Sequence, residues 1–154
     1  MGKWQDCRPN ALCSAAELHR TLASAAESLA LMGSANLRCF QTPAQTVTRA
    51  ICAMWQVFED GLYVEGKASG VGVTKAILLV TKGRLGSAFA CNVKAKLNAH
   101  YVTCPKTYLK AVVAVASELA AFEGRGQRTI EDLAVEAGRP AEVGRVVDMV
   151  LGPR

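Results

Sequence analysis

The sequence predicts an all-α fold, a compact multi-helix bundle that ends in a C-terminal helical hairpin. Hydrophobic residues make up 51% of the 154-residue chain, enough for a core, and only 6% of the residues are aromatic. Much of the apolar fraction is alanine, the strongest helix former. β-Branched residues do not alternate with polar ones, as they would in a half-buried strand. Length and composition therefore favour one helical domain, with room for a small appendage.

The first helix is predicted over Ala15–Met32. Ser14 and Glu17 form the spacing of a capping box at its start, and Gly33 is expected to end it. Its candidate core positions are apolar residues at helical spacing, namely Leu18, Leu22, Leu29 and Met32.

The second helix has a clearer start. Thr42 is predicted as the N-cap, Pro43 as the first helical residue and Gln45 as the capping-box partner. The largest apolar stripe of the chain follows at helical spacing: Val47, Ile51, Met54, Trp55, Phe58 and Leu62. A stripe of this size is typical of a helix that faces the core.

A glycine-rich stretch, Gly61–Gly72, predicts a loop. Gly66-Lys67 within it invites comparison with a phosphate-binding loop. The comparison fails because that motif needs Gly-Lys-Ser/Thr directly before a helix. The apolar segment Thr74–Thr81 is predicted as either a helix or a buried strand, since periodicity does not separate the two in so short a run.

Two further helices are predicted in the second half of the chain. Ser87 is expected to start one, with an apolar stripe at Phe89, Val93, Leu97 and Tyr101. Thr103 and Pro105 mark the start of a long helix. Its expected buried residues are Leu109, Val112, Val113, Ala116 and Leu119.

Charge is distributed unevenly along the chain, whose net charge is +5. Residues 66–117 carry eight basic side chains and no Asp or Glu. The eight are Lys67, Lys75, Lys82, Arg84, Lys94, Lys96, Lys106 and Lys110. Because the segment offers them no carboxylate, their counter-charges must lie elsewhere in the fold, on another chain or on a polyanion.

Three interpretations of this basic segment remain open. Acids of the flanking segments neutralise it, or it binds a phosphate backbone, or it meets an anionic membrane surface, for which no strongly amphipathic basic helix is present. Phosphate binding is favoured, since lysines supply sequence-independent contacts and nearby Thr, Ser, Asn and Tyr side chains add hydrogen bonds. The residues expected to bind nucleic acid are Lys82, Arg84, Lys94, Lys96, Lys106 and Lys110.

A charged, glycine-rich break at 124–127 divides the chain into a bundle, residues 1–123, and a hairpin, residues 124–154. The hairpin is expected to pack on the bundle. Thr129 and Asp132 predict the cap of its first helix. The inner face of that helix is Ile130, Leu133, Ala134 and Ala137, and the facing stripe is Val143, Val146, Val147 and Val150 or Leu151.

This last segment resembles the helix-turn-helix of bacterial DNA-binding regulators over about 20 residues. Thr129, the apolar inner face, Ala137-Gly138 at the turn and the valine-rich second helix carry the resemblance. The turn is one residue shorter before Val143, which would rotate the second helix relative to the first. The resemblance implies that Gly138 forms the turn and that Arg139, Glu142 and Arg145 lie near the DNA. A purely structural hairpin, consistent with the net acidic charge of the segment, is the alternative.

Nothing in the sequence is typical of an enzyme. The two histidines, His19 and His100, lie in no known motif, and catalysis needs several groups placed together. No cofactor or metal is therefore expected. The six cysteines show no C-x-x-C spacing and are interpreted as reduced core thiols. The N-terminal residues contain no apolar signal region, and a cytoplasmic location is expected.

In size, helix content and lysine-rich face, the chain is similar to the small subunits of bacterial CRISPR effector complexes. This similarity implies a non-catalytic subunit that contacts the backbone of RNA or DNA. It also implies binding to other protein subunits or to a second copy of the chain, and no binding to a membrane. The alternative is a helix-turn-helix transcriptional regulator. A third possibility is a scaffold whose basic face meets an acidic protein.

Overall fold

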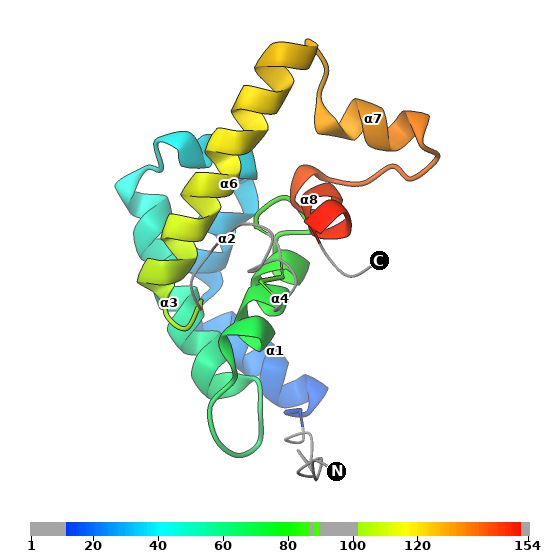
Figure 1. Ribbon diagram of the computed structural model, residues 1–154. Helices are drawn as coiled ribbons and strands as arrows, with labels where there is room; N and C mark the ends of the chain where they lie inside the picture. Colours follow the sequence, from blue (N-terminus) through cyan, green and yellow to red (C-terminus); the bar gives the residue numbers. More distant parts are fainter. Residues whose placement is uncertain (1–11, 87, 90–101, 152–154) are drawn as a thin grey trace, which may run out of the picture.

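The computed structural model describes residues 12–86, 88–89 and 102–151, and within these ranges the protein is all-α, as predicted (Figure 1). Seven α-helices and one 3-10 helix occur in the described part, with no strand. They are α1 (Ala15–Ser24), α2 (Ala26–Ser34), η1 (Leu37–Gln41), α3 (Gln45–Gly61), α4 (Gly70–Val80), α6 (Pro105–Gly126), α7 (Ile130–Glu136) and α8 (Val143–Leu151).

The predicted helix Ala15–Met32 is divided in two at Ala25, where φ is −115° and ψ is 20°. Ser14 caps α1 through the predicted capping box. α2 continues through Gly33, which therefore does not end it. The break carries neither glycine nor proline, so the sequence offers no local signal for it. On either side of the break, α1 and α2 both pack against α3.

The start of α3 also differs from the prediction. Thr42 is the C-cap of η1 and not the N-cap of α3, which begins at Gln45 after Ala44. η1 occupies the preceding five residues, Leu37–Gln41, and Thr42 follows it as the C-cap. The predicted stripe is nevertheless the core face of α3: Ile51, Met54, Trp55 and Phe58 are buried, and Val47 and Leu62 are half-buried.

The ambiguous segment Thr74–Thr81 is helical and belongs to α4, which begins inside the predicted loop. The hydroxyl of Ser69 caps the helix by accepting a 3.2 Å hydrogen bond from the Gly72 amide. A Cβ atom at Gly70 would overlap the carbonyl oxygen of Val102, so glycine is needed where these two segments pass. Gly70 and Gly72, the two glycines that follow Ser69, thus contribute to packing and to capping, respectively.

The long helix α6 starts at Pro105 as predicted and continues through the expected break to Gly126. Its predicted burial is partly wrong, since Leu109 and Val113 are only half-buried. The residues that it buries are Tyr108, Ala111, Val112, Val115, Ala116 and Leu119. Of the helix predicted to start at Ser87, Ala88 and Phe89 are not helical, and its other residues lie outside the described ranges.

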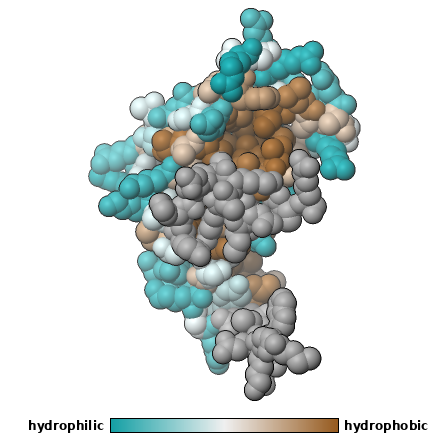
Figure 2. Space-filling view, viewed as in Figure 1, coloured by the Kyte–Doolittle hydropathy of each residue, from teal (hydrophilic) through white to brown (hydrophobic). Residues whose placement is uncertain are grey.

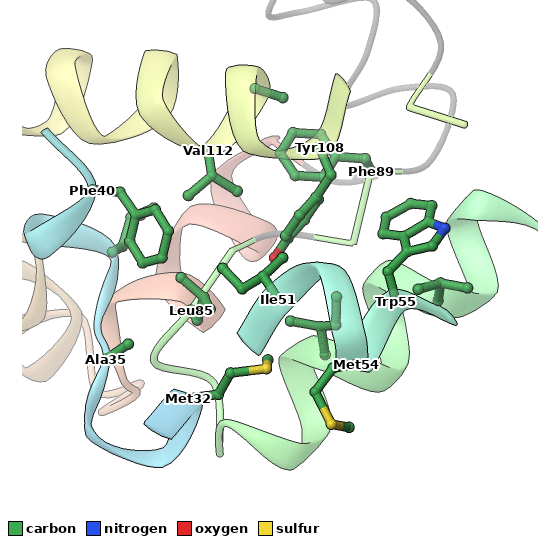
Figure 3. Packing of buried hydrophobic residues seen from close by; sticks show 14 of the residues in the cluster. Met32, Ala35, Phe40, Ile51, Met54, Trp55, Leu85, Phe89, Tyr108 and Val112 are labelled. Carbon is green, nitrogen blue, oxygen red and sulfur yellow. The ribbon is translucent and has the colours of Figure 1, made fainter. Parts of the chain in front are cut away.

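One hydrophobic cluster holds the helices together. Its aromatic part centres on Tyr108, whose ring lies 5.7 Å from that of Trp55 and 5.6 Å, edge-on, from that of Phe89 (Figure 3). Val143 and Val147 of α8 belong to the same cluster. The C-terminal hairpin is therefore packed on the bundle, with α7 and α8 beside the C-terminal half of α6 (Figure 1).

Candidate nucleic-acid interface

Two of the predicted binding residues, Lys82 and Arg84, lie in the loop that follows α4. Lys82 adopts a left-handed conformation with φ of 53°. The amides of Lys82 and Gly83 donate hydrogen bonds of 2.9 and 2.8 Å to the carbonyl oxygens of Leu79 and Leu78. This is the Schellman arrangement that ends many helices. It turns the chain sharply and leaves the Lys82 side chain exposed.

The loop packs on the first turn of α8. The amide of Arg145 donates a 2.9 Å hydrogen bond to the carbonyl oxygen of Gly83. A Cβ atom on Gly83 would lie 3.1 Å from the Cβ of Arg145 and 3.6 Å from that of Glu142. The structure therefore brings the two loop cations beside two residues of the helix-turn-helix prediction, although the sequence assigned them to separate interfaces.

The basic side chains where the loop meets α8 differ in their hydrogen-bond and ion-pair partners. Arg84 is half-buried, and its Nε donates a 3.2 Å hydrogen bond to the carbonyl oxygen of Thr81. Neither Lys82 nor Arg84 has a carboxylate within ion-pair distance in the described part of the chain. Arg145, by contrast, pairs with Asp148 at 2.8 Å. The positive charges without a carboxylate partner at this junction are therefore those of the loop residues Lys82 and Arg84.

Lys106 and Lys110 lie one turn apart near the start of α6, and both are exposed. Neither forms an ion pair with a described residue. Tyr108 lies between them in sequence but about 200° around the helix. Its hydroxyl lies beside Gly86, where an added Cβ would come within 2.4 Å of the hydroxyl oxygen. α6 thus packs against the loop that carries Lys82 and Arg84 through the face opposite its two lysines. Lys94 and Lys96 lie outside the described residues.

Among the described members of the basic segment, acids of a flanking segment neutralise Lys67. Lys67 lies 3.4 Å from a carboxylate oxygen of Glu59 and 3.6 Å from one of Asp60. These two charges raise the pKa of Lys67 above its usual value. The four described residues that were predicted to bind nucleic acid have no such partner. Lys67 therefore has a structural explanation that the other four lack.

α7 and α8 form the hairpin on which the helix-turn-helix resemblance rests. Gly138 has φ of +69° and ends α7, where the amides of Gly138 and Arg139 donate to the carbonyl oxygens of Val135 and Ala134. The connection between the helices, residues 137–142, is six residues long. A DNA-binding helix-turn-helix uses a turn of about three or four residues. The expected shortening of the turn before Val143 is therefore wrong, because α8 begins only at Val143 and the connection is longer than that of the motif.

The first turn of α8 is covered by the loop after α4. Gly144 is buried, and a Cβ there would lie 2.5 Å from the carbonyl oxygen of Gly86 and 2.7 Å from that of Gly83. Arg139 does not join this contact and instead lines a groove bounded by α6, α7 and α8. The two arginines of the helix-turn-helix prediction thus have different surroundings, Arg139 at the groove and Arg145 at the loop.

That groove is the feature that the sequence analysis missed. It has a volume of about 600 Å³, is open to solvent and is lined mostly by apolar side chains (Figure 2). Phe122 of α6 and Val150 of α8 lie in it, with 43% and 61% of their surface exposed. Phe122 extends the apolar pattern of α6 one turn beyond Leu119. This extension is the sequence feature that could have predicted an apolar surface here.

The described cysteines correct another expectation. Cys39 and Cys52 are exposed and Cys13 and Cys104 are half-buried, all as free thiols, so none of these four is a core residue. They lie on outer faces of their helices or at helix ends, where a small side chain need not be buried. Within the described ranges, no three His, Cys, Asp or Glu residues come together as a metal site would require.

No protein-family model, curated protein or solved structure matches this chain. None of the helices in the described part of the chain combines the length and the hydropathy needed to cross a bilayer. The fold and the candidate site together define an all-helical protein with unpaired cations on the loop after α4 and on the first turns of α6, and with an apolar groove between its last three helices.

Proposed function

We propose that this protein binds nucleic acid without catalysis, through its unpaired cations and the phosphate backbone. One observation carries the proposal. Four described cations of the acid-free segment, Lys82, Arg84, Lys106 and Lys110, remain without carboxylate partners among the described residues, whereas Lys67 of the same segment is paired with Glu59 and Asp60. The residues assigned to the interface are Lys82, Arg84, Lys106 and Lys110, together with Lys94 and Lys96 of the same segment.

The proposed contacts are to phosphates and not to base edges. Lysine ammonium groups are point charges that neutralise phosphates without reading sequence. Lys82 lies in a loop and Lys106 and Lys110 on a short stretch of α6, an arrangement that does not present a free recognition helix to a major groove. Such a protein fits a small helical subunit of a nucleoprotein assembly, of the type found in CRISPR effector complexes, with other subunits supplying specificity.

The test is fluorescence polarisation with labelled single-stranded RNA, single-stranded DNA and duplex DNA across a salt series. We expect binding that falls steeply with salt and depends little on sequence. Lys106→Glu and Lys110→Glu should each weaken binding and reduce the salt slope by about one. Lys67→Glu is the matched control, because it changes the net charge equally but at a residue already paired with Glu59 and Asp60.

Two results would count against the proposal. Equal losses in Lys67→Glu and Lys110→Glu would show that only total charge matters. Absence of binding to every nucleic acid at low salt would exclude the interface, and the basic residues would then be expected to meet an acidic protein.

A transcriptional regulator is the alternative, favoured by the hairpin and by the left-handed turn at Gly138. It predicts a preference for specific duplex DNA. Arg139→Ala and Arg145→Ala would then abolish binding, whereas the lysine variants would have smaller effects. The covered first turn of α8, where Gly144 is buried, favours the backbone-binding proposal over this one.

A further inference from the structure

One face of α6 borders the apolar groove and is open to solvent. Glu118, Phe122 and Arg125 occur at positions i, i+4 and i+7, so they lie on the same face of the helix. All three line the groove. Phe122 is 43% exposed, and both charged residues are exposed without an ion-pair partner in the described ranges. An aromatic residue is thus flanked along one face by an acid and a base.

We propose that this face binds a second copy of the chain, with the two α6 helices antiparallel across a two-fold axis near Phe122. Such an axis exchanges positions that lie before and after Phe122 on the helix. Glu118 then meets Arg125 of the partner subunit, and Arg125 meets Glu118 of the partner subunit. The two charges are separated by about 10 Å along the helix. Each interface therefore contains two opposite-charge pairs around an aromatic centre.

Charge complementarity favours a second copy over another occupant. A two-fold interface uses the same patch on both subunits, so the patch must complement itself. A partner helix with acidic residues on both sides of its apolar centre would place a like charge against Glu118. A partner helix with basic residues on both sides would place a like charge against Arg125. The α6 face carries one charge of each sign, four residues before and three residues after Phe122, and is therefore complementary to the same face of a second copy.

The apolar content of the groove is consistent with this occupant. Phe122, Met149 and Val150 are all partly exposed within it, and Figure 2 shows apolar residues continuing across this face. Contiguous exposed apolar surface marks association sites, and the cores of homodimer interfaces are more apolar than the remaining surface. Lys82, Arg84, Lys106 and Lys110 do not line the groove, so this proposal stands independently of nucleic-acid binding.

The experiment is sedimentation equilibrium of the full chain over a dilution series without nucleic acid. The wild type should dimerise. Glu118→Arg and Arg125→Glu each convert both ion pairs into like-charge contacts, and each should weaken dimerisation by about tenfold or more. The double variant E118R/R125E restores opposite charges and should regain the dimer. Glu65→Arg, an exposed charge reversal in a loop away from the groove, should leave it unchanged.

Circular dichroism of every variant separates loss of the dimer from loss of the fold. Phe122→Ala provides a second measurement, because truncation of a partly exposed side chain should weaken association while the helix remains intact. A wild type that is monomeric at every concentration overturns the proposal. Single variants that dimerise like the wild type, or a double variant that stays monomeric when both single variants are folded, would also overturn it.

Discussion

The backbone amide of Arg145 donates a hydrogen bond of 2.9 Å to the carbonyl oxygen of Gly83. This contact fixes α8 on the loop that follows α4, more than 60 residues earlier in the chain. Gly144 permits it, because its lack of a side chain lets the helix backbone approach the loop backbone. Asp148 adds a second link by accepting a 3.0 Å hydrogen bond from the amide of Ala88.

Gly144→Ala should therefore destabilise the protein. The added Cβ would meet backbone carbonyl oxygens of Gly86 and Gly83 at 2.5 and 2.7 Å, and backbone yields less easily than a flexible side chain. We expect a loss of about 1–3 kcal/mol in the free energy of unfolding, measured with urea. Gly124→Ala on α6 is the control, since nothing lies within 4 Å of its Cβ. That change should be neutral or stabilise by up to ~1 kcal/mol. Equal stabilities of the two variants would contradict the close packing of α8.

Arg38 of η1 joins the ends of α6 and α7. Its Nε donates a 3.0 Å hydrogen bond to Glu123, and its Nη1 donates one of 2.8 Å to Glu131. Arg38→Ala should lower the free energy of unfolding by about 1–3 kcal/mol, because two partly buried carboxylates lose their charged donor. Arg128→Ala removes the exposed pair with Glu136 and should cost less than ~0.5 kcal/mol. Calorimetry of both variants compares them, and a similar loss in each would refute the special role of Arg38.

The same cluster predicts a pH dependence. The hydrogen bond from Arg38 holds the pKa of Glu123 below the ordinary value of 4.5. A lowered pKa in the folded state stabilises the protein above the unfolded-state value, and this contribution is lost as pH falls through the folded-state pKa. The difference in unfolding free energy between wild type and Arg38→Ala should therefore be largest above pH 4.5 and shrink on acidification. A difference that is constant across urea titrations down that pH range would disprove the coupling.

Tyr108 buries a hydroxyl that has no hydrogen-bond partner among the described residues. The same burial raises its pKa well above the ordinary value of 10.0. Tyr108→Phe removes an unsatisfied polar group and keeps the ring against Trp55 and Phe89, so we expect a gain of about 1 kcal/mol in stability. Tyr63→Phe, at a half-buried position, should change little. Loss of stability in Tyr108→Phe on urea unfolding would show that the hydroxyl is satisfied in solution.

Two non-glycine residues, Lys82 and Gln127, adopt positive φ angles of 53° and 51° at the ends of α4 and α6. Glycine is the residue best suited to this conformation, so Lys82→Gly and Gln127→Gly should each stabilise by about 1 kcal/mol. Under the proposed function, only Lys82→Gly should also weaken nucleic-acid binding. Because stability rises in both variants, a loss of binding in one cannot come from unfolding. Unchanged binding in Lys82→Gly would remove that residue from the interface.

Helix content and several helix boundaries were predictable because they depend on neighbours in sequence. Ser14 and Thr129 form capping boxes with residues three positions later, and Pro105 begins α6. Gly138 ends α7 by adopting a conformation that suits glycine. The exposure of Lys106 and Lys110 followed from the same helical periodicity. In each case the interaction spans about one helical turn, which the order of residues specifies.

The features of the site required the tertiary structure. Lys67 and Lys110 look alike in sequence, yet only Lys67 lies against carboxylates of α3. The groove is lined by residues of α6, α7 and α8 that are far apart in the sequence, and Phe122 remains partly exposed in it. The sequence by itself determined which segments are helical and which side chains carry charge, since both are local properties. The tertiary structure decided which cations stay unpaired and which apolar face stays open, because both depend on contacts between residues far apart in the chain.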